Sequence, residues 1–73
     1  MNSKDFFDVL LPGTKVRVHR ELFHFVSTID DCGDVLYVFK KWNKYSHGWS
    51  YKVEPKWFIE YQFDFGALKL ESI

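Results

Sequence analysis

The stretch that decides the fold is VLYVFKKWNKYSHGWSYKVEPKWFIEY, which runs from Val35 to Tyr61. Two segments rich in β-branched and aromatic residues flank a polar segment, a pattern typical of two strands joined by a loop. In the second segment Trp49, Tyr51 and Val53 alternate with polar residues, and a period of two places them on one face of a strand. We therefore expect strands over 35–41 and 49–53 with a loop over 42–48.

The alternation resumes after Pro55, which predicts a single helical turn over 54–58 and a fifth strand over 59–65. The large apolar residues of that strand are Ile59, Tyr61, Phe63 and Phe65. A slip of one residue would turn all four to the opposite face, so the pattern specifies the register of the strand.

The N-terminal residues 1–11 are expected to form a helix. Apolar side chains recur three and four positions apart, Asn2 or Ser3 can cap the first turn, and Pro12 with Gly13 ends the helix. We interpret this helix as a lid over the core, with an amphipathic helix offered to a partner or a membrane as the alternative.

Three further strands complete the expected sheet, over 14–20, 22–29 and 67–71, the last of them at an edge. The strand over 22–29 is apolar on both faces, so either both faces are covered or a bulge near Phe25 and Val26 exchanges them. The segment 30–34 reads as a turn, since Gly33 tolerates a positive φ.

The composition describes one small domain with a rich core. The chain has 73 residues, 21% of them aromatic, and large rings supply the buried area that so short a chain needs. Cys32 is the only cysteine, which excludes a disulfide within the chain. Charged residues interrupt the apolar run at the N-terminus, so we expect no signal peptide, no membrane span and a cytoplasmic location.

The order of elements resembles that of the SH3-like small β-barrel. The resemblance rests on Pro12–Val18 as the opening strand, Gly33–Val38 as a central strand, and Tyr51–Ile59 as the fourth strand, turn and fifth strand. It implies a mainly β barrel of five to six strands over 14–65 with a short N-terminal helix, in a single domain of residues 1–73. It also implies a binding scaffold without chemistry of its own.

A loop that interleaves lysines with aromatic residues is the first candidate site. Its members are Lys40, Lys41, Trp42, Lys44, Tyr45, His47 and Trp49. Trp42 and Trp49 could form a cross-strand pair that only holds a hairpin. Alternatively, the rings anchor a protein partner, or the rings and ammonium groups bind a single-stranded nucleic acid. The formal net charge of zero argues against nucleic acid, because phosphate binding usually needs a positive field.

The second candidate is a basic outer face on the first strand, formed by Lys15, Arg17, His19 and Arg20. It would extend the first site if the two strands lie close together, and an ordinary solvated face is the alternative.

No motif predicts catalysis or a metal site. Asp30, Asp31 and Asp34 lack the spacing of a calcium loop, and turn chemistry explains them. The three histidines and Cys32 show no metal-ligand spacing, and an acidic turn is a poor setting for a nucleophilic thiolate. We therefore expect a protein that is not an enzyme and has no cofactor.

The sequence as a whole predicts a small interaction module that binds and modulates another protein through the segment 42–49. Its size, single cysteine and aromatic content resemble accessory proteins of phages and mobile elements, which often inhibit or redirect a host machine. A nucleic-acid-binding barrel that uses the same loop with Lys15 and Arg17 is the alternative. A homodimer formed by pairing of the edge strand at 68–71 is a third hypothesis.

Overall fold

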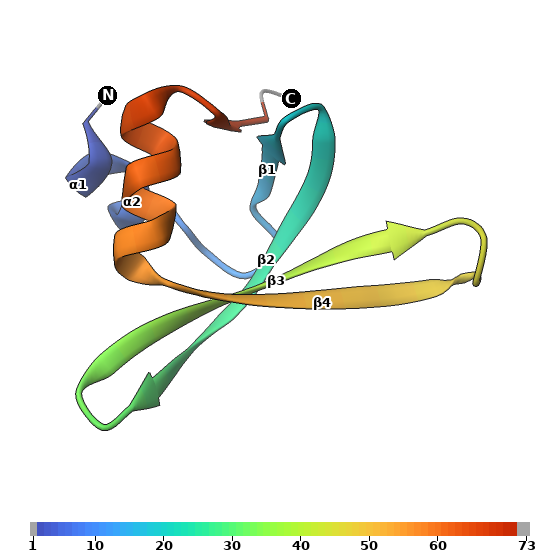
Figure 1. Cartoon of the computed structure of the whole chain (residues 1–73), viewed down its shortest axis with the longest axis horizontal. Helices are drawn as coiled ribbons and strands as arrows, with labels where there is room; N and C mark the ends of the chain where they lie inside the picture. Colours follow the sequence, from blue (N-terminus) through green and yellow to red (C-terminus); the bar gives the residue numbers. More distant parts are fainter. Residues whose placement is uncertain (1, 72–73) are drawn as a thin grey trace.

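The structure is a computed structural model that describes residues 2–71, and the fold is mainly β, as predicted. Its elements in chain order are α1 (Ser3–Asp8), β1 (Lys15–Val18), β2 (Glu21–Asp31), β3 (Asp34–Asn43), β4 (Gly48–Pro55), α2 (Lys56–Phe65) and β5 (Leu68–Leu70). The strands form one antiparallel sheet in the order β4-β3-β2-β1-β5. β4 and β5 are its two edges, so the sheet within residues 2–71 is open (Figure 1).

The two helices lie side by side at one end of the molecule, whereas the β3–β4 hairpin projects toward the other end (Figure 1). Phe6 of α1 is fully buried, and its ring stacks on Phe63 of α2 with 4.8 Å between the ring centroids. Phe7 packs against Tyr37 of β3 at 5.1 Å. The N-terminal helix therefore closes the core, and the lid interpretation is confirmed.

The bounds of that helix differ from the prediction. It spans Ser3–Asp8 instead of 1–11, and Met1 lies outside the described residues. Asn2 is the capping residue, since its side-chain oxygen accepts a hydrogen bond from the Asp5 N–H at 2.9 Å.

Of the two alternatives for the second strand, the structure has the bulge. The pairing of β2 with β3 shifts register between Phe25 and Ser27. Before the shift, Phe25 lies opposite Phe39, and both rings are buried with 5.5 Å between their centroids. The extra residue at a bulge bends a strand and increases its twist. The eleven-residue β2 can therefore pair with β1 near its start and with β3 along the rest of its length.

The predicted fifth strand over 59–65 is wrong, because these residues form most of α2. Pro55 precedes the helix, and Gly66 ends it with φ of 87°. The Gly66 N–H donates to the Phe63 carbonyl, and the Ala67 N–H donates to the Gln62 carbonyl, both at 3.0 Å. This pair of hydrogen bonds is the Schellman ending of an α-helix, so the expected single turn at 54–58 extends to ten residues.

In a helix, the apolar side chains that a strand would place on one face point in different directions. Ile59 is buried and Phe63 is half-buried, but Tyr61 and Phe65 are exposed. β5 takes the role that the fifth strand was expected to have. It pairs with β1 and forms an edge of the sheet, in agreement with the prediction of a short edge strand at 67–71.

The alternation in β4 is confirmed, but its apolar face is the exposed one. Trp49, Tyr51 and Val53 retain 41%, 63% and 48% of their accessible surface. Lys52 and Glu54 point instead toward the space between the sheet and α2. The physical reason is that α2 covers the face that carries Lys52 and Glu54.

Candidate functional site

A cluster of rings and cations lies on the outer face of the β3–β4 hairpin. Trp42 and Trp49 are cross-strand partners whose ring centroids are 5.3 Å apart in an edge-to-face arrangement. The Lys40 ammonium lies 4.3 Å from the centroid of the Trp49 ring, and the His24 ring lies 5.4 Å from it. Tyr51 is opposite Lys40 in the strand register. We call His24, Lys40, Trp42, Trp49 and Tyr51 the hairpin face.

The hairpin face continues across the sheet to the second predicted site. Lys15 on β1 is opposite His24 on β2, His24 is opposite Lys40 on β3, and Lys40 is opposite Tyr51 on β4. Directly opposite residues share one face of a sheet, so these four side chains form a row across four strands. Lys15 is therefore the residue of the first strand that lies in line with the hairpin face, and a role for it in binding stays a prediction.

The predicted loop residues do not all lie on that face. Lys41 points to the opposite side of β3, where its ammonium contacts the Glu21 carboxylate at 2.8 Å. This hydrogen bond, together with the charge of Lys41, lowers the pKa of Glu21 below its ordinary value. Lys41 therefore takes part in a cross-strand ion pair and is separated from the hairpin face.

The tip of the hairpin carries the remaining predicted residues, Lys44, Tyr45 and His47. The side-chain oxygen of Asn43 accepts hydrogen bonds from the Tyr45 and Ser46 N–H groups at 3.0 and 3.3 Å, which fixes the turn. The Tyr45 side chain is 87% exposed, and the Lys44 ammonium lies 5.5 Å from its ring centroid. The tip thus presents a ring and a cation to solvent.

Three residues of the basic first strand are placed differently from the prediction. Arg17 holds Glu71 through two hydrogen bonds, from Nε at 2.8 Å and Nη2 at 3.0 Å. These bonds lower the pKa of Glu71 and raise that of Arg17. His19 and Arg20 lie in the turn after β1, with φ of 49° and 73°, so they are not part of the strand that was expected to reach residue 20.

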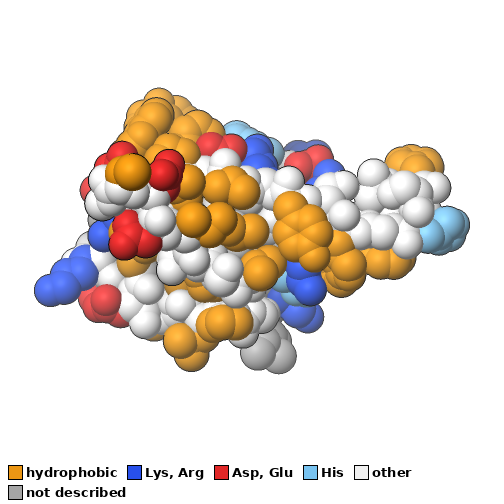
Figure 2. Space-filling model, turned by 90° about the horizontal axis from the view of Figure 1, so that it is seen from below, with side chains coloured by type: hydrophobic (Ala, Val, Ile, Leu, Met, Phe, Trp, Pro, Cys, Tyr) orange, Lys and Arg blue, Asp and Glu red, His pale blue; other side chains and the backbone are white. Residues whose placement is uncertain are grey.

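Sequence reasoning missed His24 and Tyr51 as site residues. His24 carried no signal beyond a position in an apolar strand, and its contact with Trp49 depends on the β2–β3 register. The alternation places Tyr51 on the same face as Trp49, but the predicted site ends at Trp49. Figure 2 shows hydrophobic side chains continuing from the body of the molecule onto the arm that ends at the hairpin tip.

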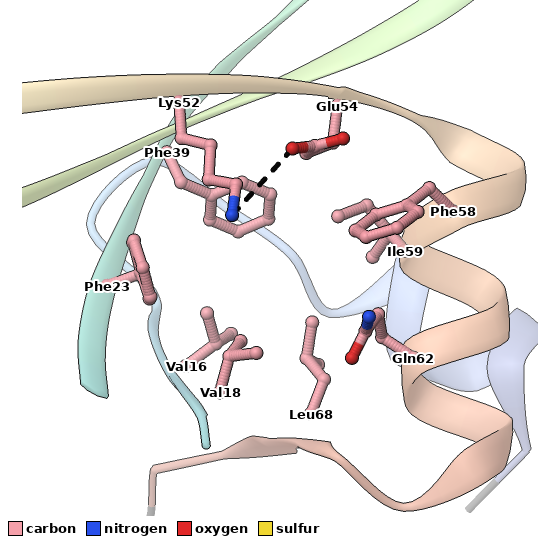
Figure 3. A pocket seen from close by; sticks show the side chains of 10 residues that line it. All are labelled: Val16, Val18, Phe23, Phe39, Lys52, Glu54, Phe58, Ile59, Gln62 and Leu68. Carbon is pink, nitrogen blue, oxygen red and sulfur yellow. Dashed lines mark ion pairs between the residues drawn. The ribbon is translucent and has the colours of Figure 1, made fainter. Parts of the chain in front are cut away.

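A second feature is a small cleft between α2 and the sheet (Figure 3). Apolar side chains such as Phe23, Phe39 and Leu68 line it, and Lys52 and Glu54 stand at one side with 3.8 Å between their charged atoms. The side-chain oxygen of Gln62 is buried there without a hydrogen-bond partner in the described part of the chain. The cleft encloses about 40 Å³, room for one or a few water molecules and too little for an aromatic ligand.

The remaining features of residues 2–71 concern metal ligation, membrane spanning and the cysteine. This segment contains no group of three or more histidine, cysteine, aspartate and glutamate side chains arranged to hold a metal ion. Neither α1 nor α2 is long and apolar enough to cross a membrane. Cys32 is exposed in the β2–β3 turn. No protein-family model, curated protein or solved structure matches the chain.

Proposed function

We propose that this protein is a non-enzymatic interaction module that binds another protein through the hairpin face. The observation that carries the proposal is a set of large rings that are exposed yet held in fixed positions. Trp42 and Tyr51 retain 49% and 63% of their surface, on strands whose pairing fixes their spacing. Tryptophan and tyrosine dominate the binding energy of many protein interfaces, because a large ring fills a pocket at a small cost in entropy.

The arrangement of Trp49 lowers that cost further. Its ring touches Trp42 at its side, Lys40 over its face and His24 at its edge. A side chain that is already ordered loses little conformational freedom when a partner binds. The cluster therefore offers a preorganised aromatic surface about which a partner can pack.

Nucleic acid is the second candidate, and the row of Lys15, His24, Lys40 and Tyr51 is the observation that favours it. Protein is preferred because the cations nearby are already engaged. Lys40 lies over the Trp49 ring, so it covers one of the two faces on which a base could stack. Arg17 and Lys41 are paired with carboxylates, which reduces the positive field available to phosphates.

We also infer an SH3-like barrel that is incompletely closed. The support is the strand order β4-β3-β2-β1-β5 and the position of α2 between the fourth and fifth strands. Such small barrels usually serve as binding scaffolds, which agrees with the proposed role. A cytoplasmic location and a modulatory or inhibitory effect on the partner stay predictions.

Affinity capture from an extract of the source cells tests the proposal. The wild-type protein and Leu11→Ala, which changes an exposed side chain on the helical end, should retain the same partner. Trp42→Ala and Tyr51→Ala should lose it while keeping the wild-type circular dichroism spectrum. Capture of the partner by all four proteins would refute the hairpin face as the site. A partner that disappears on nuclease treatment would favour the nucleic-acid alternative.

A further inference from the structure

The exposed side of α2 carries an aromatic surface that the proposed function does not use. Trp57, Tyr61 and Phe65 retain 70%, 58% and 75% of their surface. They are four residues apart, so they form one row along about 12 Å of the helix. The rings of Tyr61 and Phe65 stack at 5.8 Å with their planes 16° apart. We call these three residues the helix stripe.

Packing of the domain does not account for the helix stripe. α2 buries its opposite side, where Ile59 lies in the core and Phe63 stacks on Phe6. Three rings of this size are seldom left exposed in a row on a soluble helix unless a partner covers them. α2 lies at the end of the molecule opposite the β3–β4 turn (Figure 1). The helix stripe, which α2 carries, is therefore a separate surface from the hairpin face.

Charge identifies what kind of partner would fit. Glu60 and Asp64 occupy the next row of the helix, directly beside the rings. Trp57 also borders a hollow whose wall includes Glu60 together with Asp31 and Asp34 of the β2–β3 turn. Lys56 is the one basic residue that lines the same hollow. No cation of residues 2–71 lies within ion-pairing distance of these four carboxylates.

The two ends of the molecule thus differ in charge although the whole chain is neutral. Lys15, Lys40 and Lys44 lie on or near the hairpin face, and carboxylates border the helix stripe. Acidic side chains lie among hydrophobic ones at the end of the molecule away from the hairpin tip (Figure 2). Lys56 is the one basic residue of α2 itself, and its ammonium lies 5.0 Å from the Phe7 ring centroid.

We propose that the helix stripe binds an arginine-bearing amphipathic segment of a partner protein. A guanidinium group stacks on an exposed aromatic ring while its N–H groups reach a neighbouring carboxylate. On α2 the rings of the helix stripe lie beside the carboxylates of Glu60 and Asp64, so one guanidinium group could contact a ring and a carboxylate together. The apolar residues of the same segment would cover the remaining ring surface. The protein then has two binding surfaces of opposite charge and acts as an adaptor between two partners.

The test uses fluorescence anisotropy with labelled synthetic peptides. The first peptide is an amphipathic helix with leucine on one face and arginine on the other, and the control peptide replaces each arginine with glutamate. The full-length protein should bind the arginine peptide at least about tenfold more tightly than the glutamate peptide. A third peptide with lysine for arginine should bind more weakly than the arginine peptide, since an ammonium cannot both stack and bridge.

Variants locate the binding site. Tyr61→Ala, and separately Asp64→Lys, should weaken binding of the arginine peptide by about tenfold or more, which is the loss typical of an interface hot spot. Both positions are exposed, so the folded state tolerates the changes. Tyr51→Ala on the hairpin face is the matched control and should bind the peptide as the wild type does. A result for Tyr51→Ala in the capture experiment therefore does not bear on the helix stripe.

Two outcomes would overturn the proposal. One is equal binding of the arginine and glutamate peptides, or binding that is unchanged in Tyr61→Ala and Asp64→Lys. The other is a solution mass that corresponds to an oligomer for the wild type and to a monomer for Tyr61→Ala. That second result would mean that another copy of this chain covers the stripe.

Discussion

Removal of the Phe6 ring should destabilise the whole domain, although the residue lies in a six-residue helix near the N-terminus. Phe6 has no exposed surface, and its ring contacts Phe63 at 4.8 Å and Phe7 at 5.3 Å. Truncation of a buried phenylalanine to alanine costs about 3–5 kcal/mol, because the transfer free energy is lost and a cavity remains. A 73-residue domain is expected to have an unfolding free energy of only about 4–11 kcal/mol.

Urea denaturation followed by tryptophan fluorescence and far-ultraviolet circular dichroism measures this effect. With a slope of about 1 kcal/mol per M urea for so small a domain, Phe6→Ala should lower the midpoint by about 3 M or leave the protein unfolded. Leu11→Ala is the control, since its side chain is 66% exposed and should change the unfolding free energy by less than about 0.5 kcal/mol. A loss below about 1 kcal/mol for Phe6→Ala would refute the conclusion that α1 is part of the core.

Three further changes test local features. Arg20→Gly should raise the unfolding free energy by about 1 kcal/mol in the same urea assay, because Arg20 adopts φ of 73°, which glycine reaches without a steric penalty. Gly66→Ala should lower it by about 1 kcal/mol, since φ is 87° there and a new Cβ would meet no neighbour that compensates; an unchanged midpoint would contradict the helix ending described above. The pKa of Glu71 is lowered by Arg17, so its contribution to stability is present above about pH 4.5 and disappears as the pH falls through the folded-state pKa. Thermal unfolding of Glu71→Gln between pH 3 and 7 should therefore show a smaller loss on acidification than the wild type, and an equal loss would contradict the pairing.

The sequence predicted the sheet well because local signals and tertiary packing agree there. Alternating residues and turn residues gave the hairpins, and the register of β3 with β4 brings Trp42 opposite Trp49 as one interpretation required. The apolar two-sided character of β2 left two alternatives open, and the bulge near Phe25 is the one that the structure has. The Trp42–Trp49 pair and the irregularity at Phe25 both follow from the local pattern of residues along the strands.

The second helix was predicted as a single turn and its remainder as a strand, because a period of two and a period of 3.6 overlap over a short segment. Ile59 and Phe63 share one face in a strand and also in a helix, so they fit either period. Tyr61 and Phe65 fit the strand pattern as well, but in the helix they are exposed. Pro55 before the segment and Gly66 after it were the helix signals, and they should have outweighed the alternation. The exposed rings that misled the strand prediction are the ones that now form the helix stripe.

The candidate site was predicted in part. Trp42, Trp49 and Lys40 are together as expected, whereas Lys41 is on the other face because neighbours in a strand point in opposite directions. His24 entered the site through the pairing of distant strands, which no local pattern encodes.

The central claim is that the hairpin face binds a protein through its rings. The most direct test is the dissociation constant of the captured and purified partner, measured for the wild type and for Tyr51→Ala at several salt concentrations. We predict binding that is weaker by about tenfold or more in Tyr51→Ala and changes little with salt. Equal affinity of the two proteins, or a loss of about a thousandfold between 50 and 200 mM salt, would contradict the account.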